Sequence, residues 1–535
     1  MGKKLLARLL LRLTRAIAGR KSAPRGLASG SGRPDGAGLS PDLEANIEGI
    51  VQAFGGSGDL VVRRLRAGRS GSVSAAVVHL EGLVDKDLVA QCIIRPVTLM
   101  TENLASPSEV LDRLCDALLS VTVVDQIADA HEVALAVAEG LCVVLIDSAR
   151  TALACAVQGW AQRSPEEPTT EATVRGPKEG FVESLRINTS MLRRRIADPR
   201  LHIEERRLGR VTRTLVAMAY VQGIARPSVI QEVRSRLDKV DVDSIQESGQ
   251  LEELIMDAPL SPFPTIARSE RPDRIVGALL DGRIAIIVDG TPFVLIMPAT
   301  FMMYLTTSED YFELFYSGTL IRFTRLLALT LSLLLPSVYI AVTTFHQEML
   351  PTPLILSIAA QREGIPFPAF FEALIMEIMF ELVREAGIRL PRVIGPAISI
   401  VGVLVLGDAA IRAGLVSPIM VIVVAATGIA SLGTPEFSLA ISIRLLRFVF
   451  LAAAASLGFF GIAVGVLALY AHLTALESFG VPYMSPIAPV IDSELKDTMV
   501  RAPWWAMKQR PRSLVWYNDT RLGQGSSGKD GDGER

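Results

Sequence analysis

The chain has 535 residues, of which 50% are hydrophobic and 21% are charged, and its formal net charge at pH 7 is −2. This balance excludes the broad basic surface that nucleic-acid binding requires, so no nucleic-acid partner is expected. The apolar residues are unevenly spread, because long uncharged runs begin near residue 321 and recur as far as His472. Composition therefore predicts a soluble front part followed by a membrane part.

Residues 1–41 differ in composition from the rest of the chain. Leucine and isoleucine recur at helical spacing through residues 5–17 with lysine and arginine between them, and residues 22–41 are rich in glycine, serine and proline. The first stretch predicts a basic amphipathic helix on an anionic membrane surface, with a frayed cationic tail as the alternative. The second stretch predicts a flexible linker.

The soluble part contains an internal duplication. Residues 75–84 resemble residues 216–225, and residues 140–147 resemble residues 282–289, so the two matches share almost the same offset. In the second copy, Asp289 and Gly290 predict the turn of a hairpin between residues 284–288 and 293–297. The predicted fold class is thus an α/β soluble N-terminal region of two related subdomains followed by an α-helical multi-pass transmembrane domain. The subdomain boundaries are placed at residues 42–161 and 179–320, with a linker at residues 162–178.

The transmembrane domain is predicted at residues 321–475, with a cytoplasmic tail at residues 476–535. About 20 apolar residues cross a bilayer core of roughly 30 Å. Four spans are therefore expected. The flanking Arg322 and Arg325 place both termini in the cytoplasm by the positive-inside rule, together with the turn at Arg412, while the long loop near residues 346–392 would lie outside. The predicted spans are residues 326–345, 393–411, 415–434 and 448–471.

An acidic helix is predicted at residues 367–385, between the first two spans. Its charges would each cost up to about 3 kcal/mol at the bilayer centre, so we expect a re-entrant or interfacial helix. Glu377, Glu381 and Glu385 fall on one face of it. Either this face meets water and nearby arginines, or copies around an oligomer axis form carboxylate rings that attract cations to a pore mouth.

The second predicted span has two further features that bear on a pore. Gly395, Ser399 and Gly402 align on one face. Such a stripe of small residues either lines a narrow bore or lets helices pack closely. Asp408 lies four residues before Arg412, so these two residues are expected to form an intramembrane ion pair.

Motifs of enzymes and metal proteins are absent. The sequence has no Walker A motif, no G-x-G-x-x-G after a predicted strand, no H-E-x-x-H and no C-x-x-C. We therefore expect no catalytic residue, no cofactor and no metal, and a protein that is not an enzyme. The cysteines lack metal-type spacing and predict buried thiols in a reducing compartment; they are Cys92, Cys115, Cys142 and Cys155.

Several motifs resemble the A subunit of GerA-type spore germination receptors. The longest starts with Glu-Arg-Pro-Asp-Arg at residue 270 and runs to residue 298. A paralogous A-type protein of the spore shares the same motifs, so the resemblance covers both. The other matching segments are residues 176–195, 344–354, 361–368, 384–391, 413–418 and 501–505.

The resemblance implies a protein of the dormant spore's inner membrane, with a cytoplasmic N-terminal domain, that works beside a transporter-like B subunit and a lipoprotein C subunit. It also implies a pentamer that opens as a cation channel when a nutrient is sensed. The predicted function is thus a germinant-receptor subunit that lies among membrane lipids and releases monovalent ions. The alternative is a non-conducting signalling or scaffolding subunit that relays germinant binding. No inverted repeat is visible among the predicted spans, which argues against a transporter.

Overall fold

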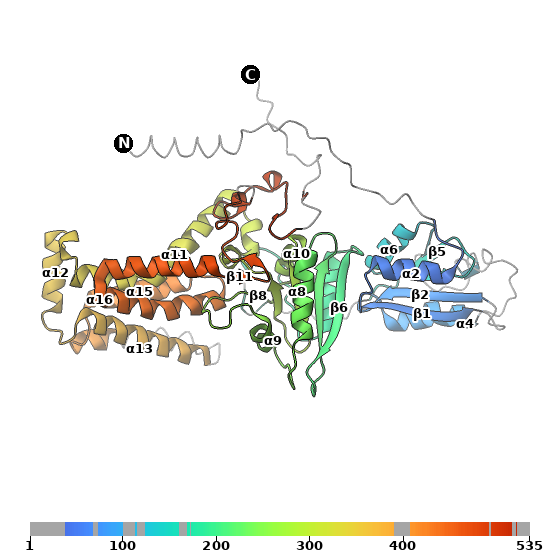
Figure 1. Cartoon of the computed structure of the whole chain (residues 1–535). Coiled ribbons are helices and arrows are strands. Elements are labelled where there is room, and N and C mark those ends of the chain that lie inside the picture. Colours follow the sequence, from blue (N-terminus) through green and yellow to red (C-terminus); the bar gives the residue numbers. More distant parts are fainter. Residues whose placement is uncertain are drawn as a thin grey trace, which may run out of the picture.

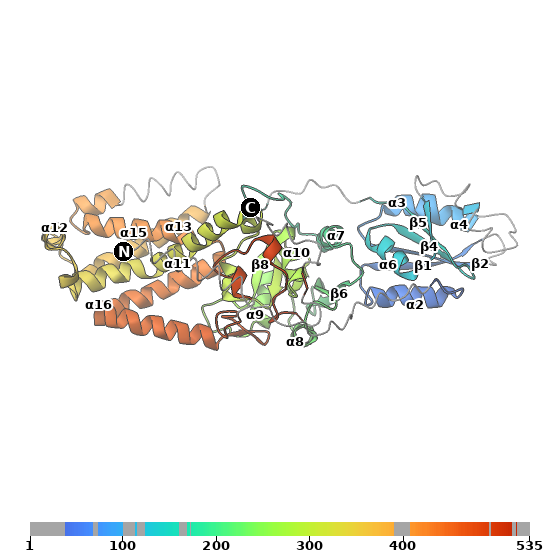
Figure 2. The same cartoon turned by 90° about the horizontal axis from the view of Figure 1, so that it is seen from above.

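The computed structural model describes residues 38–67, 73–99, 113–114, 124–159, 168, 170–171, 173–389, 407–491, 494–515 and 520–521. Three parts follow one another along a long axis (Figure 1, Figure 2): subdomain 1 at one end, subdomain 2 in the middle and a helical bundle at the other end. The predicted basic amphipathic helix lies outside the described residues.

Subdomain 1 is a five-stranded antiparallel sheet with helices on both faces. Because both faces are covered, all five residues of its strand β4 are buried. The strands lie in the order β1 (Leu60–Ala67), β2 (Val73–Leu80), β4 (Cys142–Ile146), β5 (Ala152–Cys155), β3 (Val124–Ile127). One face is covered by α2 (Leu43–Ala53) and α6 (Ala130–Ala138), and the other by α3 (Lys86–Leu88), the π-helix η1 (Val89–Ile94) and α4 (Arg95–Leu99).

Subdomain 2 repeats this architecture. Its five strands lie in the order β6 (Leu201–Leu208), β7 (Thr214–Val221), β9 (Ile284–Val288), β10 (Val294–Met297), β8 (Ala267–Ser269). One face packs on α7 (Leu185–Arg195) and α10 (Pro272–Leu280), and the other on α8 (Pro227–Asp238) and α9 (Ser248–Ile255).

The identical strand order shows that the predicted duplication is present in the fold. The matched sequence segments fall on β2 and β7 and on β4 and β9, which occupy the same positions in the two sheets. Gly140 and Gly282, which the repeat matches, have φ of 87° and 91°. This left-handed conformation lets the chain leave a helix and turn into a strand. The predicted hairpin also forms, since β9 pairs with β10 and places Ile286 opposite Leu295.

The three described cysteines are reduced. Cys142 and Cys155 lie opposite each other on β4 and β5, both buried, and Cys92 lies on η1. Burial raises the pKa of the Cys142 thiol, which keeps it protonated at neutral pH. Cys142 and Cys155 agree with the prediction of buried thiols, Cys92 is only half-buried, and Cys115 lies outside the described residues.

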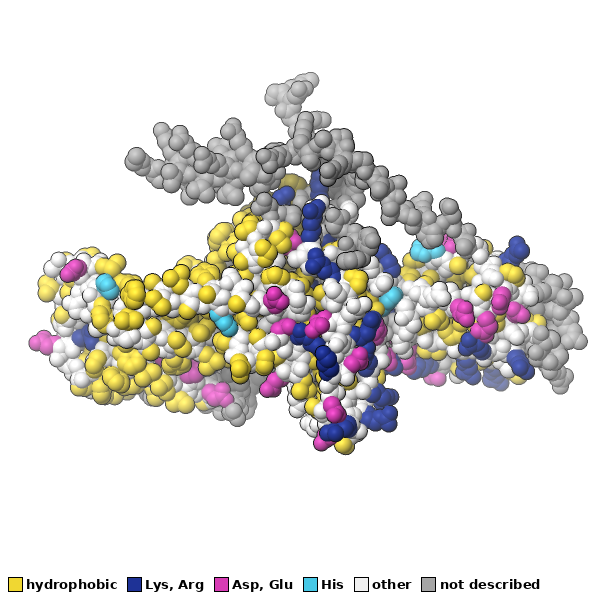
Figure 3. Space-filling model, viewed as in Figure 1, with side chains coloured by type: hydrophobic (Ala, Val, Ile, Leu, Met, Phe, Trp, Pro, Cys, Tyr) yellow, Lys and Arg dark blue, Asp and Glu magenta, His cyan; other side chains and the backbone are white. Residues whose placement is uncertain are grey.

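The bundle contains two described helices, α11 and α16, that are long and apolar enough to cross a membrane. Hydrophobic side chains dominate the surface at this end, whereas charged side chains gather over the two subdomains (Figure 3). The short helix α12 lies across the far end of the bundle (Figure 1). The bundle helices are α11 (Phe315–Thr344), α12 (Thr352–Arg362), α13 (Ala369–Arg389), α15 (Pro418–Ser431) and α16 (Phe437–Ala475).

Helix α16 doubles back on itself at Gly458. The backbone there is non-helical, with φ 60° and ψ −136°. A Cβ on Gly465 would lie 2.9 Å from the Phe450 ring, although fifteen residues of straight helix would separate them by about 22 Å. Residues 437–457 and 459–475 are therefore two antiparallel helices (Figure 2). The predicted single span at residues 448–471 is wrong, because the chain reverses inside that apolar run.

Two further expectations about the bundle need correction. A Cβ on Gly414 would lie 3.6 Å from the Gly364 carbonyl oxygen, so the turn after Arg412 lies at the same end as α12 rather than at the opposite end. The acidic helix also differs from the expected interfacial or re-entrant segment. α13 lies along the bundle beside α15 (Figure 1), with Glu372 near Ser417 at one end and a contact to Ser431 at the other.

After α16 the chain folds back onto the base of the bundle and onto subdomain 2. Arg226 donates to the Arg512 carbonyl oxygen at 2.7 Å, and Ala225 forms a β-bridge with Val515. The tail is thus tied to subdomain 2 over much of its described length. The short elements of the tail are β11 (Glu477–Ser478), β12 (Val481–Pro482), η6 (Leu495–Asp497) and η7 (Trp504–Ala506). Before α11 lie η3 (Phe301–Tyr304) and η4 (Ser308–Tyr311), and after α11 lies η5 (Gln347–Met349).

Candidate functional site

A buried ion pair ties three helices of the bundle together. Glu377 of α13 lies 2.5 Å from Nη1 of Arg447 on α16, and both side chains are almost fully buried. Arg447 also donates through Nε to the Ser332 carbonyl oxygen of α11 at 2.8 Å. A carboxylate can stay charged in such apolar surroundings only when a cation lies against it. The pair therefore explains how an acidic helix packs inside this bundle.

Two more carboxylates of α13 also have partners. Glu372 is fully buried, and its Oε2 accepts from Ser417 N at 3.0 Å and from Ser417 Oγ at 2.9 Å. Glu381 forms an ion pair with Arg444 of α16 and lies 3.7 Å from Arg384. The acidic side of α13 is thus directed toward neighbouring helices of its own chain.

A second cluster joins the bundle to subdomain 2. Arg274, on α10, lies 2.6 Å from Glu171 in the segment between the subdomains and 2.9 Å from Glu436, the N-cap of α16. Arg271 reaches the same segment, donating to the Pro177 carbonyl oxygen at 2.9 Å. The Glu-Arg-Pro-Asp-Arg motif therefore links the segment between the subdomains, subdomain 2 and the start of α16.

The base of α11 is held by a third cluster. Arg322 lies 3.2 Å from Asp310 and 3.0 Å from Asp497 of the tail, and Arg325 lies 2.8 Å from Asp310. Tyr311 donates to Asp497 at 2.7 Å. Burial raises the pKa of the Tyr311 hydroxyl, so it stays protonated and remains a donor. Of the two arginines that the sequence placed beside the first span, Arg322 thus anchors that helix to the tail, and Arg325 anchors it to the segment just before α11.

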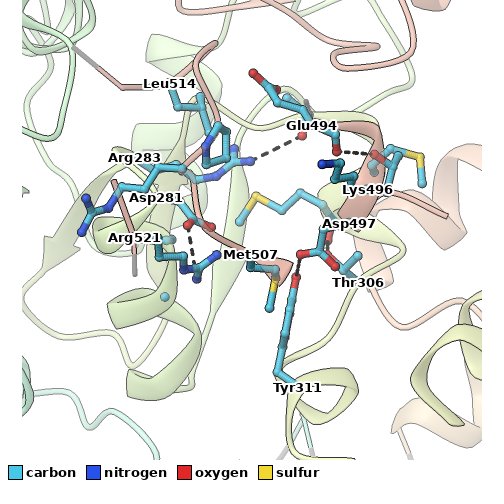
Figure 4. Close-up of a pocket in the computed structure, with 18 of the residues that line it drawn as sticks. Asp281, Arg283, Thr306, Tyr311, Glu494, Lys496, Asp497, Met507, Leu514 and Arg521 are labelled. Carbon is cyan, nitrogen blue, oxygen red and sulfur yellow. Dashed lines mark hydrogen bonds and ion pairs between the residues drawn. The ribbon is translucent and has the colours of Figure 1, made fainter. Parts of the chain in front are cut away.

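A cavity of about 380 Å³ opens beside this cluster, between α10, the segment before α11 and the tail. Figure 4 shows Asp281 and Arg283 on one side and Glu494 and Lys496 on the other. Arg521 lies 3.5 Å from Asp281, whose carboxyl pKa is raised by burial. The volume is at the small end of the range for sites that hold metabolites.

A family model described as Bacillus/Clostridium GerA spore germination protein matches residues 48–513. The chain belongs to the GerA family. It is 46% identical to spore germination protein KA of Bacillus subtilis over 486 residues, which cover 91% of this chain and 89% of that relative. It is 39% identical to spore germination protein GerLA of Bacillus cereus, covering 90% of this chain and 98% of that relative. The resemblance read from the motifs is confirmed.

Among solved structures, the chain is similar to the crystal structure of the N-terminal domain of the A subunit of the Bacillus megaterium spore germinant receptor GerK3. The identity is 33% and the TM-score is 0.37, and the match covers 50% of this chain and 98% of that structure.

The sequence-predicted site residues of this GerA-family chain fall into three groups. Glu377 and Glu381 are ion-paired within the bundle, and Glu385 lies one turn further along α13. Asp408 and Arg412 form their predicted pair at 2.8 Å, with both side chains largely exposed. The predicted small-residue stripe, Gly395, Ser399 and Gly402, lies outside the described residues. Whether any of these residues lines a pore stays a prediction.

Sequence reasoning missed Arg444 and Arg447, the partners of the α13 carboxylates. A charged residue ends an uncharged run, so the fourth predicted span starts at Phe448, directly after both arginines. A usable signal was present, since two arginines three residues apart share one face of a helix. Their position at the start of an apolar helix called for buried acidic partners.

Proposed function

We propose that this GerA-family protein is the A-type subunit of a nutrient germinant receptor in the spore inner membrane, and that it assembles into an oligomer that conducts monovalent cations. Its role is structural and conductive rather than enzymatic. The observation that carries the proposal is that α13 holds a buried carboxylate–arginine pair, Glu377–Arg447, and a half-buried one, Glu381–Arg444, within an otherwise apolar bundle. Ionisable groups are costly at such positions and mark ion pathways in membrane proteins.

The exposed surface of the bundle supports the membrane location. Large apolar side chains stand at the surface along α11, α15 and α16, including Leu327, Ile422 and Phe460, which are each more than half exposed. A water-soluble protein rarely shows so continuous an apolar surface. In the proposed orientation both subdomains lie in the cytoplasm, and the multi-pass bundle, counting the two halves of α16 separately, lies in the bilayer.

The ion pairs suggest how the bundle could conduct. Glu377 is neutralised by Arg447, whereas Glu381 is less buried and nearer the base of the bundle. In the proposed oligomer, a pentamer by family resemblance, Glu381 and Glu385 bias the entrance toward cations, and the Gly395, Ser399 and Gly402 stripe faces the axis. B-type and C-type subunits are the proposed partners, and lipids surround the bundle.

A second function, a non-conducting subunit that relays a binding event, is supported by the Arg274 cluster. That guanidinium contacts both the segment between the subdomains and the start of α16, so a change in subdomain arrangement could be transmitted to the bundle. The two functions differ in whether the chain itself passes ions.

Potassium efflux from proteoliposomes distinguishes them. The double variant Glu381→Gln/Glu385→Gln is expected to lower the flux, more strongly at low ionic strength where screening is weak. Glu363→Gln, which alters an exposed carboxylate beside α12, is the matched control and should leave the flux unchanged. The role of the Glu377–Arg447 pair is tested separately: Glu377→Gln should lower the yield of folded protein because it leaves Arg447 buried without a counter-charge, and the charge reversal Glu377→Arg/Arg447→Glu should restore that yield.

The small-residue stripe gives an independent arm. Ser399→Phe is expected to block efflux while the protein still assembles, and Ser399→Ala is expected to conduct normally, because only the bulky ring can occlude a bore. Normal efflux in both the acidic double variant and Ser399→Phe, at normal protein levels, would exclude conduction through these residues and favour the relay function.

A further inference from the structure

The base of the bundle carries an aromatic and basic collar, formed by Phe315, Tyr316, Trp504, Trp505, Lys496 and Lys508; three of these residues, Trp504, Lys496 and Lys508, also line the cavity described above. Tyr316 and Trp505 are 60% and 58% exposed, and the two lysines are exposed as well. Within the described residues neither lysine forms an ion pair. Exposed aromatic rings beside unpaired lysines are unusual on a soluble surface and are typical of the boundary between lipid and water.

The collar is held rigidly at the first turns of α11. Trp504 Nε1 donates to the Tyr311 carbonyl oxygen at 3.4 Å, and the two rings lie 5.8 Å apart. Arg501 N donates to Thr319 Oγ1 at 3.1 Å, which fixes the tail against α11. Trp504 is therefore held against Tyr311, just before Phe315 and Tyr316, because the tail is tied to that helix, although the whole bundle separates these residues in sequence.

The collar continues into the apolar surface of the bundle. On α11 the exposed side chains Tyr316, Leu320, Phe323, Leu327 and Leu331 follow one another at intervals of three or four residues, so they form one stripe along the helix. The stripe starts at the collar and runs toward α12. The aromatic end is thus the natural boundary of the apolar surface.

We infer that this collar binds the anionic phospholipid surface of the leaflet that faces the subdomains. The inference rests on the proposed membrane location of the bundle. Tryptophan and tyrosine rings settle at the head-group level, and lysines next to them attract anionic head groups. Aromatic rings are also enriched at protein–protein interfaces, but lysine is depleted there, so the combination of exposed aromatic rings with lysines favours a lipid surface. The C-terminal tail is consequently a membrane anchor, and it couples the leaflet to subdomain 2 through the contacts that the tail makes there.

Depth-dependent fluorescence quenching tests the inference on the full chain reconstituted in vesicles. The reporter is Trp505, left as the single tryptophan by the changes Trp160→Phe, Trp504→Phe and Trp516→Phe; the phenylalanine at position 504 keeps a ring against Tyr311. We expect its emission to be lost in lipids brominated near the head-group end of the acyl chain and retained in lipids brominated at the chain centre. Val211→Trp in the tryptophan-free chain, at an exposed position of the β6–β7 turn of subdomain 2, should keep its emission in both.

Variants of the two lysines test whether the collar prefers anionic lipids. Quenching of Trp505 should be stronger in phosphatidylglycerol than in phosphatidylcholine vesicles, and Lys496→Gln/Lys508→Gln should remove that difference. Equal quenching in both lipids before the lysine changes would overturn the anionic part of the inference.

A further reporter separates this inference from the membrane proposal. Leu331→Trp in the tryptophan-free chain should be quenched by bromine at the chain centre if the bundle is inserted. If Leu331→Trp is quenched and Trp505 is not, the collar does not meet lipid. If neither is quenched, the membrane location itself is wrong. The last outcome is that Trp505 in detergent is protected from a water-soluble quencher and its emission changes with protein concentration. That result would show that a second copy of the chain, and not lipid, covers the collar.

Discussion

The ion pair between Arg193 and Asp59 joins the two subdomains, and we predict that removing one partner separates them locally. Arg193 lies on α7 and Asp59 lies just before β1. Nε of the arginine is 2.8 Å from one carboxylate oxygen and Nη2 is 3.0 Å from the other. Nη2 also donates to Ser57 Oγ at 3.0 Å, and that oxygen accepts from Ile203 N at 2.8 Å.

The size of the effect follows from burial. Both side chains of the pair are 1% exposed, so Asp59→Asn leaves a guanidinium in the interface without a counter-charge. Breaking a buried pair in this way costs about 3–5 kcal/mol, whereas replacing both partners with apolar residues of similar size is often neutral. At about 1.4 kcal/mol per factor of ten, the lower figure corresponds to a loss of protection of roughly 100-fold.

Hydrogen exchange at the Ile203 amide of the full chain in detergent is the direct readout, because this amide donates across the interface. The matched control is Glu44→Gln, which breaks a bidentate pair with Arg64 of similar geometry that is exposed to solvent. The control should leave the exchange of Ile203 unchanged. If Asp59→Asn accelerates exchange no more than Glu44→Gln does, burial does not strengthen this pair and the reasoning fails.

Two further predictions concern the turn of α16 and a half-buried carboxyl, Glu252. Gly458→Ala should cost about 1–3 kcal/mol and lower the yield of folded protein, because its φ of 60° suits glycine and a Cβ would lie 2.9 Å from the His346 ring. Gly277→Ala, in α10 with nothing within 4 Å of the added Cβ, is the control and should be neutral or stabilising by up to about 1 kcal/mol, because alanine favours a helix interior. Burial raises the pKa of Glu252 from 4.5 to about 7, so the folded state disfavours its ionised form and loses stability as the pH rises through that range. Glu252→Gln should therefore raise the melting temperature at pH 8 more than at pH 5. Equal increases in melting temperature at the two pH values would contradict this prediction. So would the same increase in the control variant Glu253→Gln.

The ordered soluble part was largely readable from local patterns. The duplication, the β9–β10 hairpin and the family resemblance each rest on residues that are close in sequence or repeat at a fixed offset. Strand alternation, turn residues such as Asp289 and Gly290, and positive-φ glycines act locally, so the letters themselves carry the information.

The arrangement of the bundle was decided by tertiary contacts. The run from residue 448 to 471 is apolar on both sides of Gly458. Hydropathy therefore cannot distinguish a single membrane-spanning helix from two helices that reverse direction at Gly458. The partners of α13 lie on other helices and far along the chain, as with Glu377 and Arg447, and only packing brings them together. Sequence by itself determined the two related α/β subdomains, the apolar character of the C-terminal part and the family. The tertiary structure decided which charges meet, where the chain turns and how the tail returns to subdomain 2, because each of these depends on the free energy of contacts between distant segments.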